Sequence, residues 1–301
     1  MLLRTVFLSA YSERKRETTL LSYRHAFHAG NFADVLKHSV LHYVLNYMGN
    51  KDKGYTYIDT HSGAGMYKLH DQYAQKTGEY KQGIEKLYDA DNLSPLLEEY
   101  VALIKQLNQG KPLSVYPGSQ AIAHFHGRKQ DSARLFELHK SDAALLTSFT
   151  ENWRQAQVMI TDGYKGLIRQ LPPTTHRGVV LIDPPYEIKT DYQKAVKAII
   201  DGSKKFSTGT YILWYPVVTR SLIDDMEASL LDSGIRNVLK AEFCMKPDSE
   251  LYGMTGTGLF IVNPPWQLKG LLEDALPQFQ SLLASENSNE ASFTINQMVE
   301  E

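Results

Sequence analysis

The chain has 301 residues, of which 43% are hydrophobic and 22% are charged, and its formal net charge at pH 7 is −2. This length suffices for one large α/β domain with an insertion or for two domains, and the charge balance restricts any nucleic-acid site to a local basic patch. The single cysteine, Cys244, excludes an intrachain disulfide and a cysteine-cluster zinc site. No apolar run approaches the roughly 20 residues of a membrane span. We therefore expect a cytoplasmic protein with no membrane contact and no signal peptide.

The first part of the chain contains one helix, one strand and a glycine loop. Residues 1–20 show no clear periodicity, and we expect a disordered extension there. Apolar residues recur at helical spacing over 31–49, and a predicted strand over 54–59 leads directly into the loop at 61–65. The stretch 67–130 is polar and mostly helical, which we interpret as an insertion after the first strand of the sheet.

Strands and helices alternate through the rest of the chain. Further strands are predicted at 134–138, 157–160, 179–182, 211–214, 238–243 and 258–262, with helices at 143–155, 191–206, 221–233 and 268–283. This alternation predicts an α/β fold with a doubly wound, mainly parallel sheet of seven strands. No helix separates the last two strands, so we expect an antiparallel pair at one edge. The core would comprise 21–66 and 131–285, followed by a polar tail at 286–301.

The most informative motif is Asp183-Pro184-Pro185-Tyr186, which follows the apolar strand at 178–182. Open α/β sheets bind ligands at the carboxyl ends of their strands. The aspartate and a backbone carbonyl can accept hydrogen bonds from an exocyclic amine, proline stiffens the backbone, and the tyrosine ring can stack on a base. The motif is typical of enzymes that methylate amino nitrogens of adenine. A strand followed by an ordinary Pro-Pro turn has the same pattern.

The glycine loop is a candidate cofactor site. Gly63 and Gly65 form a Gly-x-Gly pair after the first strand of the sheet, but Lys68 occupies the place of the third glycine of the dinucleotide fingerprint. A cofactor without a pyrophosphate needs a less close approach of the helix, and S-adenosylmethionine is such a cofactor. A glycine-rich turn without a ligand is the alternative.

Acidic residues end the next two predicted strands. Glu137 ends the second strand, where a ribose-binding carboxylate is expected, although it lies much farther from the glycine loop than the usual ~20 residues because of the insertion. Asp162 and Gly163 end the third strand, where a carboxylate can accept from the adenine amine of a cofactor and a backbone N–H can donate to its ring. The succession of these motifs at strand ends is far more specific than any one of them.

In this order the motifs resemble the bacterial 23S rRNA adenine-N6 methyltransferase family RlmJ (YhiR), over about residues 20–285. The matching segments are 21–25, 27–31, 33–38, 59–61, 63–65, 77–80, 116–119, 137–139, 182–186, 214–218, 253–255 and 263–266. The resemblance implies a Rossmann-like methyltransferase core with a small helical insertion. It also implies S-adenosyl-L-methionine as the cofactor and the N6 amine of one adenine in 23S rRNA as the target.

The resemblance also implies roles for individual residues. Together with the glycine loop, it places cofactor contacts at His38, His61, Gly63, Ser119, Glu137, Asp162, Gly163 and Asp183. Asp183 is expected to act at the target amine, with the Pro184 carbonyl and the Tyr186 ring holding the base. Tyr23 is expected to contact the RNA, and Arg24 and Lys37 to contribute to a basic patch for it. The expected partner is protein-free or early-assembly rRNA, and the expected state is a monomer.

Other interpretations remain open. The same chemistry could act on adenine in DNA, and the same fold could serve as a non-catalytic RNA-binding module. The motif Asn263-Pro264-Pro265-Trp266 is a rival catalytic site, but it ends the last strand rather than the fourth, so we interpret it as a structural turn. The histidine pairs at 25/28 and 124/126 lack the surroundings of known zinc motifs, and we expect no metal. Asp183 either takes the amine proton or only polarises the amine.

Overall fold

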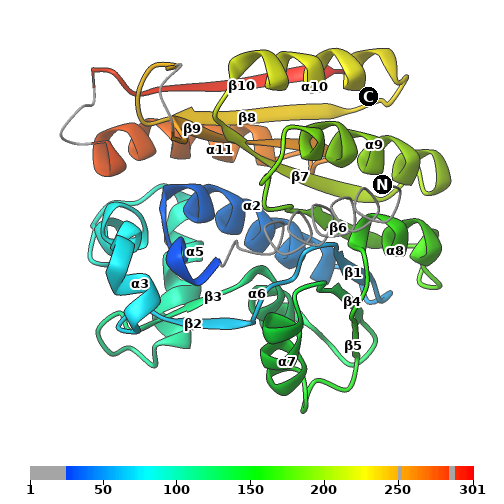
Figure 1. Cartoon of the computed structure of the whole chain (residues 1–301), viewed down its shortest axis with the longest axis horizontal. Coiled ribbons are helices and arrows are strands. Elements are labelled where there is room, and N and C mark those ends of the chain that lie inside the picture. Colours follow the sequence, from blue (N-terminus) through cyan, green and yellow to red (C-terminus); the bar gives the residue numbers. More distant parts are fainter. Residues whose placement is uncertain (1–24, 250–252, 285–288) are drawn as a thin grey trace, which may run out of the picture.

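Eight strands form one mixed sheet at the centre of the protein (Figure 1). The structure is a computed structural model, and it describes residues 25–249, 253–284 and 289–301. The strand order is β10-β8-β9-β7-β6-β1-β4-β5. The strands are β1 (Thr56–Asp59), β4 (Ser132–Phe136), β5 (Ala156–Met159), β6 (Gly178–Ile182), β7 (Thr210–Val217), β8 (Val238–Cys244), β9 (Gly256–Val262) and β10 (Ser292–Val299).

Five neighbouring strands are parallel, and they create the edge where the motifs meet. β5, β4, β1, β6 and β7 run in one direction, whereas β9 is antiparallel to both β7 and β8. The predicted doubly wound sheet is confirmed. After β1 the chain adds β4 and β5 on one side of it and then crosses to add β6 and β7 on the other side. At such a switch point, the carboxyl ends of β1, β4, β5 and β6 surround one crevice.

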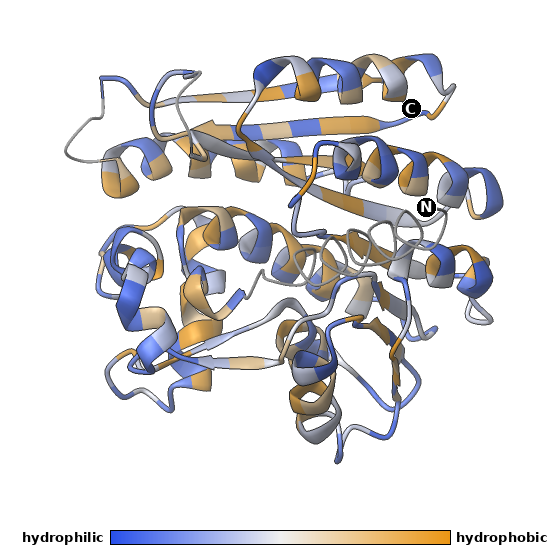
Figure 2. Cartoon of the chain, viewed as in Figure 1, coloured by the Kyte–Doolittle hydropathy of each residue, from blue (hydrophilic) through white to orange (hydrophobic). Residues whose placement is uncertain are grey.

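Helices cover both faces of the sheet. α8 (Gly163–Gln170), α9 (Thr190–Lys205) and α10 (Arg220–Asp232) pack on one face, and α2 (Phe32–Gly49), α7 (Lys140–Phe149) and α11 (Leu268–Gln278) pack on the other. The residues of β6 alternate accordingly, with Val179 and Leu181 in one core and Val180 and Ile182 in the other. Figure 2 shows apolar and polar residues alternating around α9 and α10, as expected for helices with one buried side.

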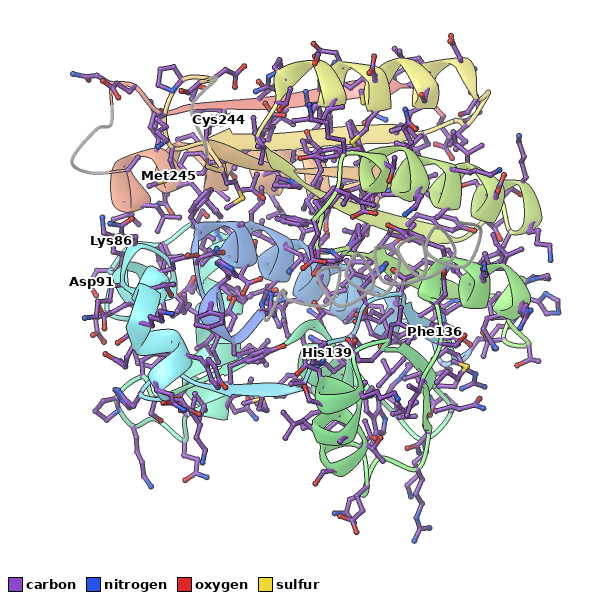
Figure 3. All side chains as sticks on the ribbon, in the orientation of Figure 1. Lys86, Asp91, Phe136, His139, Cys244 and Met245 are labelled. Carbon is purple, nitrogen blue, oxygen red and sulfur yellow. The ribbon has the colours of Figure 1, made fainter. Side chains whose placement is uncertain are left out.

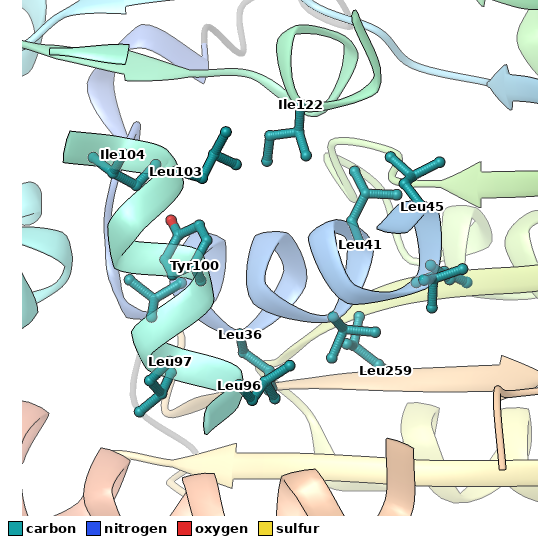
Figure 4. Close-up of a cluster of buried hydrophobic side chains, with 14 of the residues drawn as sticks. Leu36, Leu41, Leu45, Leu96, Leu97, Tyr100, Leu103, Ile104, Ile122 and Leu259 are labelled. Atoms are coloured by element: carbon teal, nitrogen blue, oxygen red, sulfur yellow. The ribbon is translucent and has the colours of Figure 1, made fainter. Parts of the chain in front are cut away.

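The segment between β1 and β4 contains several short elements. They are β2 (Met66–Lys68), α3 (Gln72–Thr77), η2 (Glu79–Gln82), α4 (Ile84–Tyr88), α5 (Pro95–Leu107), β3 (Val115–Pro117) and α6 (Ser119–His126). The two-stranded sheet of β2 and β3 was not predicted from the periodicity. Leu96 and Tyr100 of α5 pack against α2 near Leu36, with Ile122 of α6 close by, so a continuous apolar core attaches this segment to the sheet (Figure 4).

Two sequence expectations about the sheet were wrong. The sheet has eight strands rather than seven, because β10 lies in the segment expected to be a polar tail and pairs antiparallel with β8. β10 mixes polar and apolar side chains and is only partly buried, so it lacks the apolar run that marks a central strand. The expected antiparallel pair of β8 and β9 is present, but β10 rather than this pair forms the edge.

The remaining expectations concern the termini and the membrane. Residues 1–20, expected to be an extension, lie outside the described residues. Within the described ranges, no helix is both long enough and apolar enough to cross a bilayer.

Candidate active site

Two adjoining cavities open at the carboxyl edge of the parallel strands. The larger has a volume of about 790 Å³, and its walls include the glycine loop and the ends of β4, β5 and β6. The smaller, of about 460 Å³, is lined by residues of α2, η2, β7 and the Asp-Pro-Pro-Tyr segment. Four residues line both cavities: His25, Lys37, Asp183 and Pro185. A group held at Asp183 therefore faces both spaces.

The glycine loop has a backbone that only glycine adopts without strain. Gly63 has φ +66°, and a Cβ there would lie 2.6 Å from the hydroxyl oxygen of Tyr67. Its N–H donates to Glu137 Oε2 at 2.8 Å, while Glu137 Oε1 accepts from the His139 N–H at 2.6 Å. Glu137 thus joins the loop to the end of β4, the part of the chain where Figure 3 labels Phe136 and His139. Burial raises the pKa of Glu137 above its ordinary value, although these two N–H donors oppose the shift.

The start of α8 packs directly on the same loop. A Cβ on Gly163 would lie 1.9 Å from the carbonyl oxygen of Thr60, so only glycine permits this approach. Asp162 caps the helix by accepting from the Lys165 N–H at 3.1 Å. His61 Nδ1 lies 2.8 Å from Thr60 Oγ1, and burial lowers the pKa of His61 to about 4, so its imidazole is neutral at pH 7.

His38 and Ser119 form another wall of the larger cavity. His38 Nε2 lies 3.1 Å from Ser119 Oγ, and His38 Nδ1 lies 2.9 Å from the hydroxyl of Tyr116. That hydroxyl is in turn 2.6 Å from the hydroxyl of Tyr100, so α5 and β3 fix the imidazole. Only 1% of the His38 surface is exposed, and burial lowers its pKa to about 3. His38 is therefore a neutral, buried group and not an ordinary surface histidine.

Asp183 is held by a buried lysine. Lys37 Nζ lies 2.6 Å from Asp183 Oδ2 and 2.9 Å from Asp34 Oδ1, and Asp34 Oδ2 lies 2.9 Å from His25 Nε2. Burial favours the neutral amine, but the two carboxylates outweigh it and raise the pKa of Lys37 above its ordinary value. Burial likewise opposes ionisation of Asp34, yet His25 and Lys37 hold its pKa well below the usual range. The four side chains form one charged network beneath both cavities.

The surroundings of Lys37 differ from those of a lysine in a surface patch. We expected Lys37 to contribute to a basic patch for RNA; its side chain is 3% exposed, is engaged by two carboxylates and lines both cavities. A lysine that binds phosphate from a surface patch is accessible to solvent. Lys37 instead neutralises the carboxylates of Asp34 and Asp183. Lys37 belongs to the floor of the site as the counter-ion of Asp183.

Aromatic rings line the smaller cavity. The Tyr186 hydroxyl donates to the carbonyl of Trp214 at 2.6 Å, and the two rings meet edge to face with centroids 5.6 Å apart. Tyr186 has φ +49°, an uncommon conformation that this hydrogen bond helps to hold. Phe32, Trp214 and Met254 complete the apolar wall. The cavity therefore combines a carboxylate at Asp183 with flat apolar surfaces, as a site for a heteroaromatic base requires.

A family model described as ribosomal RNA large subunit methyltransferase D, RlmJ, matches residues 52–295 of the chain. The chain belongs to the RlmJ family. It is 46% identical to ribosomal RNA large subunit methyltransferase J of Escherichia coli over 273 residues, which cover 91% of this chain and 98% of that protein. It is also 46% identical to the protein of the same name from Haemophilus influenzae over 270 residues, covering 89% and 96%.

A solved structure shares the fold of this RlmJ family member. A protein from Legionella pneumophila, known from a crystal structure, superposes with a TM-score of 0.81 at 37% sequence identity, over 89% of this chain and 98% of that one. The chain is thus a methyltransferase with the Rossmann-like fold, and S-adenosylmethionine is its cofactor.

The rival motif, Asn263-Pro264-Pro265-Trp266, lies beside the amino ends of the parallel strands, opposite the carboxyl ends where Asp183 lies. Because β9 is antiparallel to β7, its last residue, Val262, pairs with Tyr211 near the start of β7. Asn263 has φ +51°, and its amide donates to the carbonyls of Ser207 and Gly209 at 2.8 Å. These bonds support the interpretation of this segment as a structural turn in this RlmJ family member.

Some site residues were missed, and others cannot be placed. Sequence reasoning did not identify His25 and Asp34 as members of the charged network, although Asp34 precedes Lys37 by three residues and so shares its helix face. Tyr23 and Arg24 lie outside the described residues. Among the residues that the structure describes, no group of three or more His, Cys, Asp and Glu side chains is arranged to hold a metal ion.

Proposed function

We propose that the chain transfers the methyl group of S-adenosylmethionine to the N6 amine of a specific adenine in 23S rRNA. One observation carries the proposal: Asp183 lies in the wall common to two cavities, so a cofactor in one and a base in the other would both reach it. The names of the relatives, both large-subunit rRNA methyltransferases, support the substrate class.

The donor and acceptor groups of the larger cavity fit the cofactor. Glu137 would accept from ribose hydroxyls and Asp162 from the adenine amine, while the Gly163 N–H would donate to the adenine ring. The neutral imidazoles of His38 and His61, the Ser119 hydroxyl and the backbone at Gly63 offer polar contacts without adding net charge. When bound, the cofactor supplies an electrophilic methyl group on a sulfonium.

The smaller cavity would hold the target base. The adenine amine is a poor nucleophile because its lone pair is delocalised into the ring. Lys37 engages Oδ2 of Asp183, which leaves Oδ1 and the Pro184 carbonyl to accept hydrogen bonds from N6. The rings of Tyr186 and Trp214 offer stacking surfaces, which offset part of the few kcal/mol that removal of a base from its stack costs. Alignment of the reacting atoms can contribute roughly 7–11 kcal/mol.

The RNA would approach from the open side of the smaller cavity. Tyr23 and Arg24 remain predicted RNA contacts, since both immediately precede His25, which lines both cavities. We also propose that the substrate is protein-free or early-assembly rRNA, that the protein acts as a monomer, and that it works in the cytoplasm.

A methyl-transfer assay tests the proposal. The purified protein and methyl-labelled S-adenosylmethionine are incubated in separate reactions with extracted rRNA, assembled ribosomal subunits, DNA and total protein from cells that lack the enzyme. We expect label in 23S rRNA as N6-methyladenosine, and more transfer to extracted rRNA than to assembled subunits. Label in DNA alone would replace rRNA by the DNA alternative. Absence of label from every substrate would favour the non-catalytic module. The Asp183→Ala variant, which removes the acceptor for the target amine, serves as the inactive control.

A further inference from the structure

One acidic residue in the wall of the smaller cavity has no part in the mechanism above. Glu79 begins η2, directly after Gly78 ends α3 with φ +64°. The hydroxyl of Thr77 donates to the Phe27 carbonyl, which anchors this corner against the turn before α2. The corner therefore projects Glu79 from the segment between β1 and β4 into the cavity that faces Asp183.

Glu79 is a fixed and ionised hydrogen-bond acceptor. Its Oε1 lies 2.9 Å from His28 Nδ1, and its Oε2 accepts from Asn31 Nδ2 at 2.9 Å. Burial alone would raise the pKa of Glu79, but the hydrogen bonds from His28 and Asn31 outweigh it and lower the pKa below the ordinary value. The side chain is still 34% exposed. A carboxylate offers about four acceptor sites, so Glu79 can accept a further bond from a ligand.

The lining of the smaller cavity divides into regions of different chemistry. Asp183 and Lys37 form an ion pair in the lining, and rings and apolar side chains form a wall. Glu79, His28 and Asn31 form a hydrogen-bonded polar group that also lines the cavity. An adenosine that places N6 at Asp183 and its base along the wall directs its sugar away from Asp183. An ionised carboxylate repels phosphate but accepts well from a hydroxyl group.

We propose that Glu79 accepts a hydrogen bond from the 2′-hydroxyl of the target adenosine and thereby makes the enzyme prefer RNA to DNA. This inference rests on the proposed function, because it assumes an adenosine in the smaller cavity. The 2′-hydroxyl is the group that distinguishes RNA from DNA at a given nucleotide. It is also a donor, as an acceptor-only carboxylate requires.

The first test changes one atom of the substrate and leaves the enzyme intact. A 23S rRNA fragment that contains the methylated adenosine is made with a 2′-hydroxyl, 2′-hydrogen or 2′-fluorine at that nucleotide alone, and kcat/KM is measured for each. We expect both the deoxy and the fluoro substrate to lose roughly 10- to 100-fold, because neither donates a hydrogen bond. Equal rates for all three substrates, or a fluoro substrate as good as the hydroxyl substrate, would overturn the proposal.

The second test assigns the effect to Glu79. In Glu79→Gln the preference for the 2′-hydroxyl over the 2′-hydrogen should fall to about threefold or less, with the rate on the deoxy substrate retained. Glu85→Gln is the matched control, since Glu85 is exposed in the same segment and does not line the cavity. An equal loss on both substrates would mean that Glu79 only supports the structure, and it would reject the proposal.

Failure of the proposed function gives a different result. In that case the unaltered enzyme would methylate neither the ribose nor the deoxyribose form of the fragment.

Discussion

The segments Asp183-Pro184-Pro185-Tyr186 and Asn263-Pro264-Pro265-Trp266 occupy opposite edges of one sheet. The first ends a parallel strand, and its carboxylate lies between two cavities with a buried lysine as its partner. The second ends an antiparallel strand, and its amide is bound to two backbone carbonyls. Two similar tetrapeptides therefore differ in role because strand direction decides which edge each one reaches.

Replacement of Asp183 and of Asn263 should have the largest and most different effects on the two segments. Asp183→Ala removes the acceptor for the target amine, and transfer should fall by at least ~10²- to 10³-fold, as for loss of a preorganised polar group. Asn263→Ala removes two hydrogen bonds, so it should cost roughly 1–3 kcal/mol of stability and leave the rate within about threefold. Labelled-methyl transfer and chemical unfolding measure the two effects. Loss of transfer in Asn263→Ala with activity intact in Asp183→Ala would reverse the roles.

Loss of Lys37, the partner of Asp183, should lower both the stability of the protein and its activity. Lys37→Met leaves Asp34 and Asp183 without their shared counter-ion, and we expect a loss of about 3–5 kcal/mol in the free energy of unfolding. Methyl transfer should also fall, because Asp183 loses the contact that orients it.

A mutant at the opposite edge provides the control for Lys37. Lys269→Met changes a lysine that lines neither cavity, and it should be neutral in both assays. A Lys37→Met protein as stable as the original would contradict the counter-ion role.

The pH dependence of stability should reveal the titration of Asp59, a buried acid at the carboxyl end of β1. Burial, with a further contribution from nearby Asp183, raises the pKa of Asp59 to about 7, against the opposing hydrogen bond from Tyr57. A folded-state pKa above the unfolded value means that this group favours folding at low pH and that the benefit is lost as pH rises from about 4 to 7.

Asp59→Asn removes this titration. Relative to the variant, the original protein should lose up to about 1.4 kcal/mol of stability per pH unit across that window. Chemical unfolding at a series of pH values measures the difference, and a difference that stays constant with pH would contradict the raised pKa.

The smallest effect is expected at the exposed ring of the structural turn. Trp266 is 78% exposed, so Trp266→Ala should change stability by no more than about 0.5 kcal/mol and leave transfer unchanged. A large loss of transfer in Trp266→Ala would show that the two ends of the parallel strands are not independent.

Near Asp183, Tyr186→Phe removes the hydrogen bond to the Trp214 carbonyl and should lower the free energy of unfolding by about 1 kcal/mol.

The sequence predicted seven of the eight strands of the large sheet and the order of their terminal motifs, because both are local patterns. The apolar run before Asp183 and the Gly-x-Gly pair at Gly63 and Gly65 are visible without any tertiary contact. By contrast, Lys37 and Asp183 are 146 positions apart, and only the fold brings them to 2.6 Å. A lysine of a basic patch and a buried counter-ion have the same local pattern in the sequence.

Two other features escaped prediction for the same physical reason. β10 is a partly exposed strand whose pairing with β8, rather than its own composition, makes it a strand. Glu79 belongs to a polar stretch with no period, and the turn at Gly78 is what brings it to the cavity that Asp183 also lines.

The wall that both cavities share has a thermodynamic consequence. If a ligand in one cavity displaces the Asp183 carboxylate, the wall of the other cavity changes as well. By thermodynamic linkage, if the bound methyl donor changes the affinity for RNA by some factor, bound RNA changes the affinity for the donor by the same factor. The same reciprocity applies separately to the product pair, so departure of the demethylated donor changes the affinity for the modified strand by the factor that couples those two products.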